Sequence, residues 1–280
     1  MEHITRTVYG SYLQTCLKLR IPHLIPAYTT LNEKLGIQSG VTPAPGVYPE
    51  VGYFCIGNKG HQSQIGADGI GLNVVAQHRA TDAALFNQLP FVLRDINNDL
   101  TSTERVNYAL RKEEIHDGQT YVAYYLRRIN KTNVVAEMQY RSNTNGTTIV
   151  TPFVPTPDNL NPLPVEIPES GTTTLTGDYV TVTAEVDISL SEWEVAELLD
   201  VADILYGDSS YAIISEIGLC SGTSKVVTVT PSVGVPFNFT EAVGVQIATH
   251  VAVMNMVRYS NGGVARILGL GTNDPLFNIF

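Results

Sequence analysis

The chain of 280 residues has few charged side chains: they make up 16% of it, against about a quarter in an average globular protein. Hydrophobic residues reach 44%, which is enough for a sizeable core. The polar surface must then consist largely of Thr, Ser, Asn and Gly. A polar but weakly charged surface of this kind suits burial against partner proteins better than it suits a freely diffusing enzyme.

Cysteine is also scarce. Cys16, Cys55 and Cys220 lie far apart and are odd in number, so no disulfide framework is implied, and buried free thiols in a reducing cytoplasm are expected. No run of about 18 apolar residues occurs, and the first residues lack a basic region followed by an apolar core. We therefore expect a protein that folds in the cytoplasm and makes no membrane contact.

The net charge of −10 is unevenly distributed. Residues 1–130 carry 12 Lys and Arg against 11 Asp and Glu, whereas residues 131–280 carry 5 against 16. An acidic half repels nucleic-acid phosphates, so dedicated DNA or RNA binding is not expected. The asymmetry fits complementary contacts with different protein neighbours.

The stretch GNKGHQSQIGADGIG, residues 57–71, is the first candidate for a ligand site. Lys59 and Gly60 do not match the phosphate-binding loop Gly-x-x-x-x-Gly-Lys-Ser/Thr. Gly66, Gly69 and Gly71 occur in the reverse order of the dinucleotide-binding motif. The stretch is interpreted as a mobile surface loop with several residues at positive φ.

Metal-ligand spacing is equally absent. His61, Asp68 and His78 are too widely spaced for a His-x-x-x-His pair, and no Cys-x-x-Cys pair exists. Residues 95–100, DINNDL, lack the central Gly and closing Glu of a calcium loop. The remaining histidines are single: His3, His23, His116 and His250. We predict no metal site and no cofactor.

Nucleophilic catalysis has no sequence anchor. No Gly-x-Ser-x-Gly elbow occurs, and no local motif pairs Cys55 with His61 or His78. Glu113 and Glu114 alternate to opposite sides of a predicted strand, so they cannot act as one acid–base couple. The acids of SEWEVAELLD are expected on the solvated face and first turn of a helix. We predict no catalytic residues and no enzyme activity.

Secondary-structure patterns predict a mainly β protein with a few helices, β-sandwich-like sheets, long irregular loops and an extended Pro-rich arm. In residues 1–150, an N-terminal mixed β and loop region, we expect a short helix over 10–19 and a strand over 53–57. A helical turn near 103–108 is expected to be capped by Thr101 or Asn98. Asp117-Gly118 and Asn145-Gly146 indicate tight hairpin turns.

Residues 152–168 contain six of the 15 prolines, so 151–169 are predicted to be a linker or arm. Residues 170–280 form a second, β-rich region. In YVTVTAEVDISL, Val180 to Leu190 alternate strictly, which indicates a strand with one buried face. Ser191 and Glu194 form a capping box that opens a helix over 191–206, Gly207 ends it, and Trp193 is placed on its core face.

ISEIGLCSG, residues 214–222, resembles a strand and turn found in tail-associated bacteriophage proteins. MVRYSNGGVARILGLGTNDPLFNIF, at the end of the chain, is similar in pattern to the C-terminus of baseplate wedge proteins of contractile-tailed phages. Residues 89–129 resemble uncharacterised virion proteins of large tailed phages. The resemblance covers about a third of the chain, and the first 90 residues lie outside it. It implies a β-rich, non-catalytic protein that pairs with a second copy and binds neighbouring baseplate subunits.

The expected function is therefore a virion structural subunit of a tailed phage, assembled in the host cytoplasm, at the baseplate or another tail ring. Its partners would be other tail proteins and further copies of itself, in a homo-oligomer or dimer. Arms at 40–50 and 152–168, a patch of Tyr121, Tyr124 and Tyr125, and a final strand over 276–280 would make the contacts. Alternatives are a neck, collar or head–tail connector protein, a receptor- or carbohydrate-binding β-sandwich, and a hydrolase with a dispersed site in residues 57–78.

Overall fold

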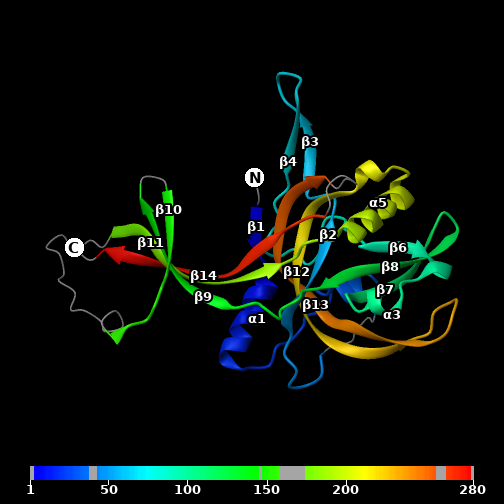
Figure 1. Cartoon of the computed structure of the whole chain (residues 1–280), viewed down its shortest axis with the longest axis horizontal. Helices are drawn as coiled ribbons and strands as arrows, with labels where there is room; N and C mark the ends of the chain where they lie inside the picture. Colours follow the sequence, from blue (N-terminus) through cyan, green and yellow to red (C-terminus); the bar gives the residue numbers. More distant parts are fainter. Residues whose placement is uncertain (1–2, 38–42, 145–146, 158–173, 257–262, 279–280) are drawn as a thin grey trace. The chain divides into compact units, whose positions relative to one another are not determined.

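A computed structural model of the chain describes residues 3–37, 43–144, 147–157, 174–256 and 263–278 (Figure 1). The protein is mainly β, as the sequence predicts, and its strands pair antiparallel. Contacts divide the chain into two units. Unit 1 comprises Met1–Ile129 and Ser189–Ala265, and unit 2 comprises Asn130–Ile188 and Arg266–Phe280. Each unit is described by itself.

Unit 1 is built on one large sheet, in which the central strands run β1-β13-β12-β2-β8-β6, with β5 on β2 and β7 on β8. Its two longest strands are neighbours and carry much of the buried core. The strands are β1 (His3–Arg6), β2 (Glu50–Gly57), β5 (Gln88–Leu89), β6 (Val92–Asp95), β7 (Tyr108–His116), β8 (Gln119–Arg128), β12 (Ile213–Val229) and β13 (Phe237–Met256).

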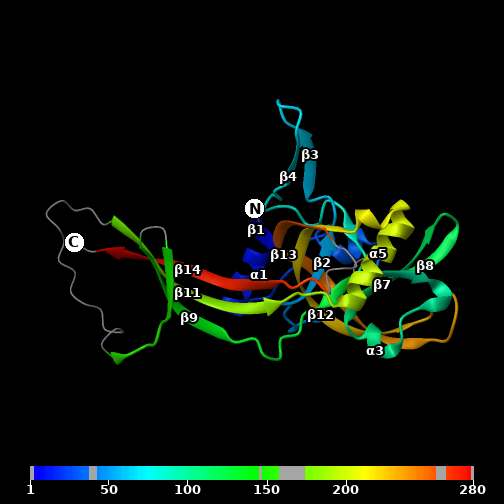
Figure 2. The ribbon, with the colours of Figure 1, turned by 45° about the horizontal axis from the view of Figure 1, so that its top comes forward.

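The helices of unit 1 lie around this sheet, with α1 beside β13 and α5 beside β6 (Figure 2). They are α1 (Val8–Leu19), α2 (Leu31–Lys34), α3 (Ser102–Arg105) and α5 (Glu192–Tyr206), with short 3₁₀ turns η1 (Ile96–Asn98) and η2 (Ser209–Tyr211). The predicted caps are confirmed. Thr101 caps α3, Ser191 and Glu194 form the capping box of α5, and Gly207 ends α5 with φ 73°.

The face of α5 that packs on the sheet differs from the predicted one. Val195, Leu198 and Ala202 are buried, whereas Trp193 is half-buried beneath the guanidinium of Arg94. The prediction that the helix acids are solvated is wrong for two of them. Glu194 and Glu197 are buried because Arg127 of β8 and Arg94 of β6 pair with them.

The predicted hairpin of β7 and β8 is confirmed. Asp117 and Gly118 both adopt positive φ, at 50° and 80°, as a two-residue turn of this kind requires. The predicted tyrosine interface patch is wrong in part, because Tyr124 and Tyr125 are buried in unit 1. Tyr125 donates to the Glu114 carboxylate, and burial raises the pKa of its phenol well above the ordinary value.

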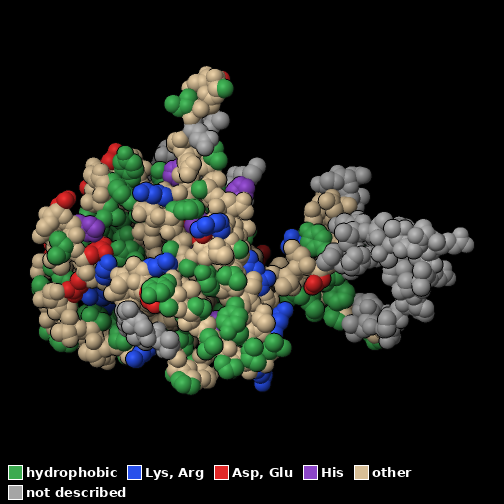
Figure 3. Space-filling view, turned by 180° about the vertical axis from the view of Figure 1, so that it is seen from behind, with side chains coloured by type: hydrophobic (Ala, Val, Ile, Leu, Met, Phe, Trp, Pro, Cys, Tyr) green, Lys and Arg blue, Asp and Glu red, His purple; other side chains and the backbone are tan. Residues whose placement is uncertain are grey.

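The interpretation of residues 57–71 as a mobile loop is also wrong. They form a two-stranded hairpin of β3 (His61–Ile65) and β4 (Gly71–Val75), which projects from unit 1 (Figure 1). The turn closes with a hydrogen bond from Gly66 N to Ile70 O at 2.7 Å. Ile65, Ile70 and Val74 are exposed on this hairpin, and Figure 3 shows hydrophobic atoms at its tip.

Unit 2 is a four-stranded sheet in the order β10-β9-β11-β14. Its strands are β9 (Ala136–Thr144), β10 (Thr147–Pro152), β11 (Thr174–Asp187) and β14 (Ile267–Asn278). The predicted one-sided burial of β11 is confirmed only near its end. Val186 is buried, but Val182 is 38% exposed and Thr181, on the opposite face, is fully buried. The Asn145-Gly146 turn lies outside the described residues.

The two units differ from the predicted division at residues 150 and 170. The last strand, β14, pairs with β11 along Ile267–Asn278, so the end of the chain belongs to the same sheet as β9 and β10. The segment between, with α5, β12 and β13, belongs to unit 1. Sequence patterns identify strands but not their partners. Most of the predicted linker 151–169, part of the arm 40–50 and the last residues of the chain lie outside the described residues.

Candidate functional site

The residues predicted as possible metal ligands do not form a metal site. His61 lies in β3, and Asp68 accepts a hydrogen bond from Ile70 N within the hairpin turn. His78 is buried and contacts Glu216 instead. Within the part of the chain that the structure describes, no group of three or more His, Cys, Asp or Glu side chains could hold a metal ion.

A fully buried carboxylate, Glu216 of β12, is the centre of the densest polar cluster in unit 1. Its Oε2 accepts from Phe86 N at 2.8 Å and lies 2.9 Å from His78 Nε2. Its Oε1 accepts from Asn87 N at 2.9 Å and from Lys59 N at 3.3 Å. The carboxylate therefore ties the segment before the hairpin and the segment 78–87 to the central sheet.

The glycines of the opening stretch serve this cluster. A Cβ on Gly57 would lie 2.5 Å from Glu216 Oε1, and a Cβ on Gly60 would lie 2.4 Å from Ser215 O. Gly60 N donates to Ser215 Oγ at 2.8 Å. The backbone here must approach β12 closely, and only glycine permits that approach. These glycines fit against a protein carboxylate, so they are explained without a phosphate ligand.

Two stacked imidazoles close the cluster. The rings of His78 and His250 lie 3.9 Å apart and nearly parallel, and Phe86 stacks on His78 at 4.1 Å. His250 Nε2 lies 3.1 Å from Asp82 O. Burial lowers the pKa of His250 to about 4, so its ring is neutral at pH 7. With Glu216 at 0% exposure, the cluster has no access for a substrate and stabilises the fold.

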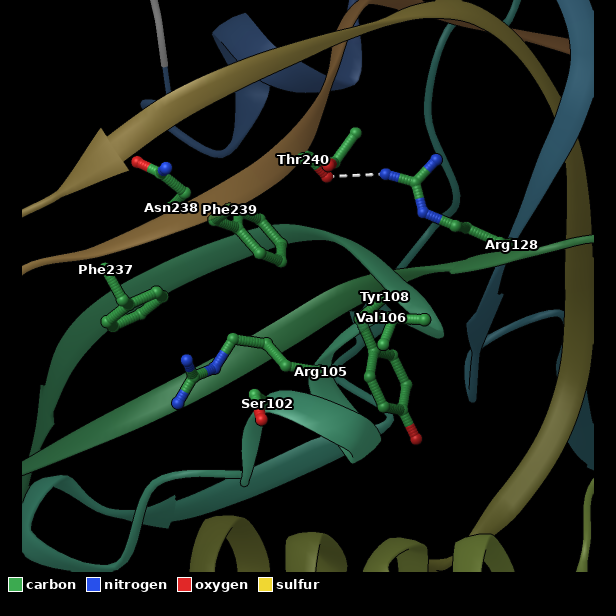
Figure 4. Close-up of a pocket in the computed structure, with 9 residues that line it drawn as sticks. All are labelled: Ser102, Arg105, Val106, Tyr108, Arg128, Phe237, Asn238, Phe239 and Thr240. Carbon is green, nitrogen blue, oxygen red and sulfur yellow. Dashed lines mark hydrogen bonds between the residues drawn. The ribbon is translucent and has the colours of Figure 1, made fainter.

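The most enclosed part of the surface near β13 is a hollow of about 460 Å³ between α3, β7 and β13 (Figure 4). Val106, Tyr108 and Phe239 contribute its apolar wall. Arg105 and Arg128 lie at its two ends and point in different directions (Figure 4). The hollow is therefore lined by rings and guanidinium groups, which are donors with no ability to exchange protons near neutral pH.

Each of these arginines already holds the fold together. The Arg105 guanidinium stacks on Phe237 at 3.8 Å, and its Nε donates to Tyr124 Oη at 3.2 Å. Arg128 Nη1 donates to Ser224 Oγ at 3.2 Å, and its Nη2 donates to the carbonyl of Thr240 (Figure 4). The arginines thus fix the β12–β13 hairpin over β7 and β8. No nucleophile and base are paired among the residues that line the hollow.

A second hollow of about 710 Å³ lies at the base of the β3–β4 hairpin. His61 and Ser63 of β3 line it, facing two exposed tyrosines, Tyr206 and Tyr211, whose rings are 5.5 Å apart. Asn58 Nδ2 donates to Tyr206 Oη at 3.2 Å. The sequence analysis singled out His61 but missed both tyrosines, which come from α5 and η2, far along the chain.

The cysteines have no reactive role in this arrangement. All three are buried free thiols, as predicted. Cys55 Sγ and Cys220 Sγ lie 3.7 Å apart on the neighbouring strands β2 and β12. Burial raises the pKa of the Cys220 thiol well above its usual value, which keeps it protonated and weakly nucleophilic.

The surface of unit 2 is the largest departure from an ordinary globular domain. Among its described residues, only Thr181, Val186, Ile188 and Leu268 are buried. All six residues of β10 are exposed, and Met138, Ile149 and Val150 present apolar side chains. We call this exposed sheet, β10-β9-β11-β14, the open sheet.

Among the described residues, no helix is both long enough and apolar enough to cross a bilayer. The chain matches no curated protein and no solved structure. One family model matches it, over residues 1–279, and it is described as a family of unknown function, DUF7208. Because the match spans almost the whole sequence, the chain belongs to the family of unknown function DUF7208.

Proposed function

We propose that this protein is a structural subunit of a tailed-phage particle, most specifically a component of the tail baseplate wedge that binds neighbouring subunits. In this role the folded chain performs no chemistry. Unit 1 provides a rigid body, and the open sheet and the β3–β4 hairpin provide the surfaces that neighbours cover. The sequence resemblance to wedge proteins supplies the phage context, and the exposed strands support the assembly role.

The open sheet is the observation that carries the proposal. A sheet of this size is normally stabilised by packing one apolar face on a core. Here Val182, Ile149 and Val150 are each more than a third exposed, and few side chains of the sheet are buried. Exposed apolar side chains gathered on one sheet mark a surface that functions when covered. Covering by other subunits is the arrangement a particle provides.

The β3–β4 hairpin supports the same role. Ile65 is 81% exposed and Ile70 is 61% exposed, at the end of two strands that pair only with each other. An isolated hairpin of this length is marginally stable in water. Insertion into a neighbouring subunit would bury these side chains and hold the hairpin in place.

An amber mutation in the gene, grown with and without suppression, tests the proposal. Without the protein, the lysate should contain heads and incomplete tails by electron microscopy, and few infectious particles. Supplying the wild-type chain from a plasmid should restore complete tails. Unsuppressed lysates with normal particles and normal titre would refute the structural role.

The hollow beside Tyr206 and Tyr211 favours one second candidate, a receptor-binding module that recognises a sugar. Two exposed aromatic rings above amide and hydroxyl groups form the surface on which sugar rings stack. A glycan array probed with the wild-type chain and with Tyr211→Ala tests it. Binding that Tyr211→Ala abolishes would favour this candidate, and an array without signal would reject it.

A further inference from the structure

The free edge of the open sheet is strand β10, Thr147–Pro152. It pairs with β9 on one side only, in the register Thr147 to Thr144 through Pro152 to Gln139. The next residue, Phe153, donates its N–H to Met138 O at 2.9 Å. Backbone groups alternate in direction along an antiparallel strand. Thr151, Ile149 and Thr147 therefore direct their N–H and C=O groups toward β9.

It follows that Thr148, Val150 and Pro152 direct their backbone groups away from the sheet. Pro152 has no N–H, so its outward position leaves no donor unpaired, which is where proline is tolerated in an edge strand. Thr148 and Val150 retain an outward donor and an outward acceptor each. β10 thus offers a short edge of backbone groups that ends at Pro152.

This edge lacks the usual protection against pairing. Natural edge strands carry charged side chains, especially Lys, or bulges that prevent contact with another strand. β10 reads TTIVTP and has no charged residue and no register shift against β9. The rest of unit 2 is acidic, with 3 Lys and Arg against 8 Asp and Glu, so the uncharged edge is a local exception.

We propose that β10 pairs antiparallel with β10 of a second copy of this chain, about a two-fold axis at Ile149. The inference deepens the proposed assembly function, on which it rests, by naming one neighbour. The two four-stranded sheets would join into one continuous sheet. Closed two-fold pairing of this kind is the commonest way for identical chains to associate.

The sequence of β10 matches itself when reversed, which argues for a second copy as the partner. About Ile149, Thr148 faces Val150 of the other copy, and Thr147 faces Thr151. Thr and Val have nearly the same shape, so the strand presents the same β-branched outline in both directions. Cross-strand pairs of β-branched residues are favourable in antiparallel sheets.

The position of Pro152 selects this register. With the axis at Ile149, the outward groups of Thr148 bond to those of Val150 in the other copy, and every N–H meets a C=O. With the axis at Val150, Thr148 would face Pro152, which has no N–H, and one carbonyl would lose its partner. The nearest charged side chain, Arg141, lies one strand further in on β9, so the two copies of it are well separated.

Sedimentation velocity of the purified full-length chain over a concentration series tests the inference. The wild-type chain should form dimers. Val150→Pro removes an N–H that the single sheet leaves unused, so the fold should survive while dimerisation weakens at least about tenfold. Ile149→Lys places like charges at the axis and should have a similar effect without changing the backbone.

Val182→Lys is the matched control, because Val182 is an exposed apolar residue on an inner strand of the same sheet. It should dimerise as the wild type does. A wild-type chain that is monomeric at every concentration would overturn the inference. So would unchanged dimerisation of Val150→Pro and Ile149→Lys, or loss of dimers in Val182→Lys alone. Dimers in solution and loss of tails in the amber mutant are independent readouts, so either idea can fail without the other.

Discussion

Replacing the buried carboxylate Glu216 by Gln should destabilise unit 1 strongly. The carboxylate accepts hydrogen bonds from Phe86 N, Asn87 N and Lys59 N and contacts His78. Gln keeps one acceptor oxygen and places an NH₂ group where the other oxygen was. At least one enclosed backbone N–H then faces another donor and loses its partner.

The expected loss can be estimated from these contacts. An enclosed donor left without an acceptor costs about 1–3 kcal/mol, and hydrogen bonds to a charged group are worth about 1.5–3 kcal/mol each. Breaking one partner of a buried charged pair typically costs about 3–5 kcal/mol. We expect Glu216→Gln to lower the free energy of unfolding by about 3–5 kcal/mol, a large part of the total of a typical domain.

Guanidinium denaturation followed by tryptophan fluorescence is the assay. The single tryptophan, Trp193, lies in α5 of unit 1, the same unit as Glu216, so its emission reports the relevant transition. Glu192→Gln, at an exposed position of α5, is the control and should change stability by less than about 0.5 kcal/mol. A loss below about 1 kcal/mol in Glu216→Gln would refute the view that this carboxylate organises unit 1.

Three further predictions concern stability. Burial raises the pKa of Glu241 to about 7, so its carboxyl stabilises the fold while neutral, and this contribution is lost as pH rises from about 4.5 to 7; Glu241→Gln should be more stable than wild type by about 2 kcal/mol at pH 8 and equal at pH 4, and a pH-independent difference in melting temperature would contradict this. The lowered pKa of His250, about 4, means that the unfolded chain takes up the proton first, so acidification from pH 6.5 to 4 should cost up to about 3 kcal/mol, which acid titration of wild type against His250→Gln measures; parallel curves would exclude the imidazole as the cause. Ser191→Ala removes the cap of α5 and should cost about 1 kcal/mol in denaturant unfolding, with Ser210→Ala in the η2 turn as the comparison; equal small losses would argue against the capping box.

Local features of the fold could be predicted because local chemistry determines them. The capping box of Ser191 and Glu194 and the Asp117-Gly118 turn involve residues close in sequence. They require particular backbone conformations that few residue types provide. The same reasoning explains why α1, α3 and α5 were found near their observed positions.

Features that depend on distant partners could not be predicted. Glu194 and Glu197 read as solvated helix acids because Arg94 and Arg127 lie about a hundred residues or fewer away on other strands. The cluster around Glu216 joins residues from three distant segments, and no spacing rule connects His78 to it. Gly57 and Gly60 were the only visible signal, and their meaning depends on β12 lying against them.

The division into units was missed for the same reason. The proline-rich segment looked like a boundary because proline disfavours regular structure. The actual organisation follows from β14 pairing with β11, which brings the end of the chain into the open sheet. Strand partners are set by the whole fold and not by the alternation within one strand.

Quantitative mass spectrometry of gradient-purified phage particles tests the central claim, that this chain acts as a component of the particle. The account predicts that peptides of the chain co-purify with tail proteins at a fixed, small copy number per particle that does not change on further purification. A chain that is abundant in infected cells but absent from purified particles would contradict the account.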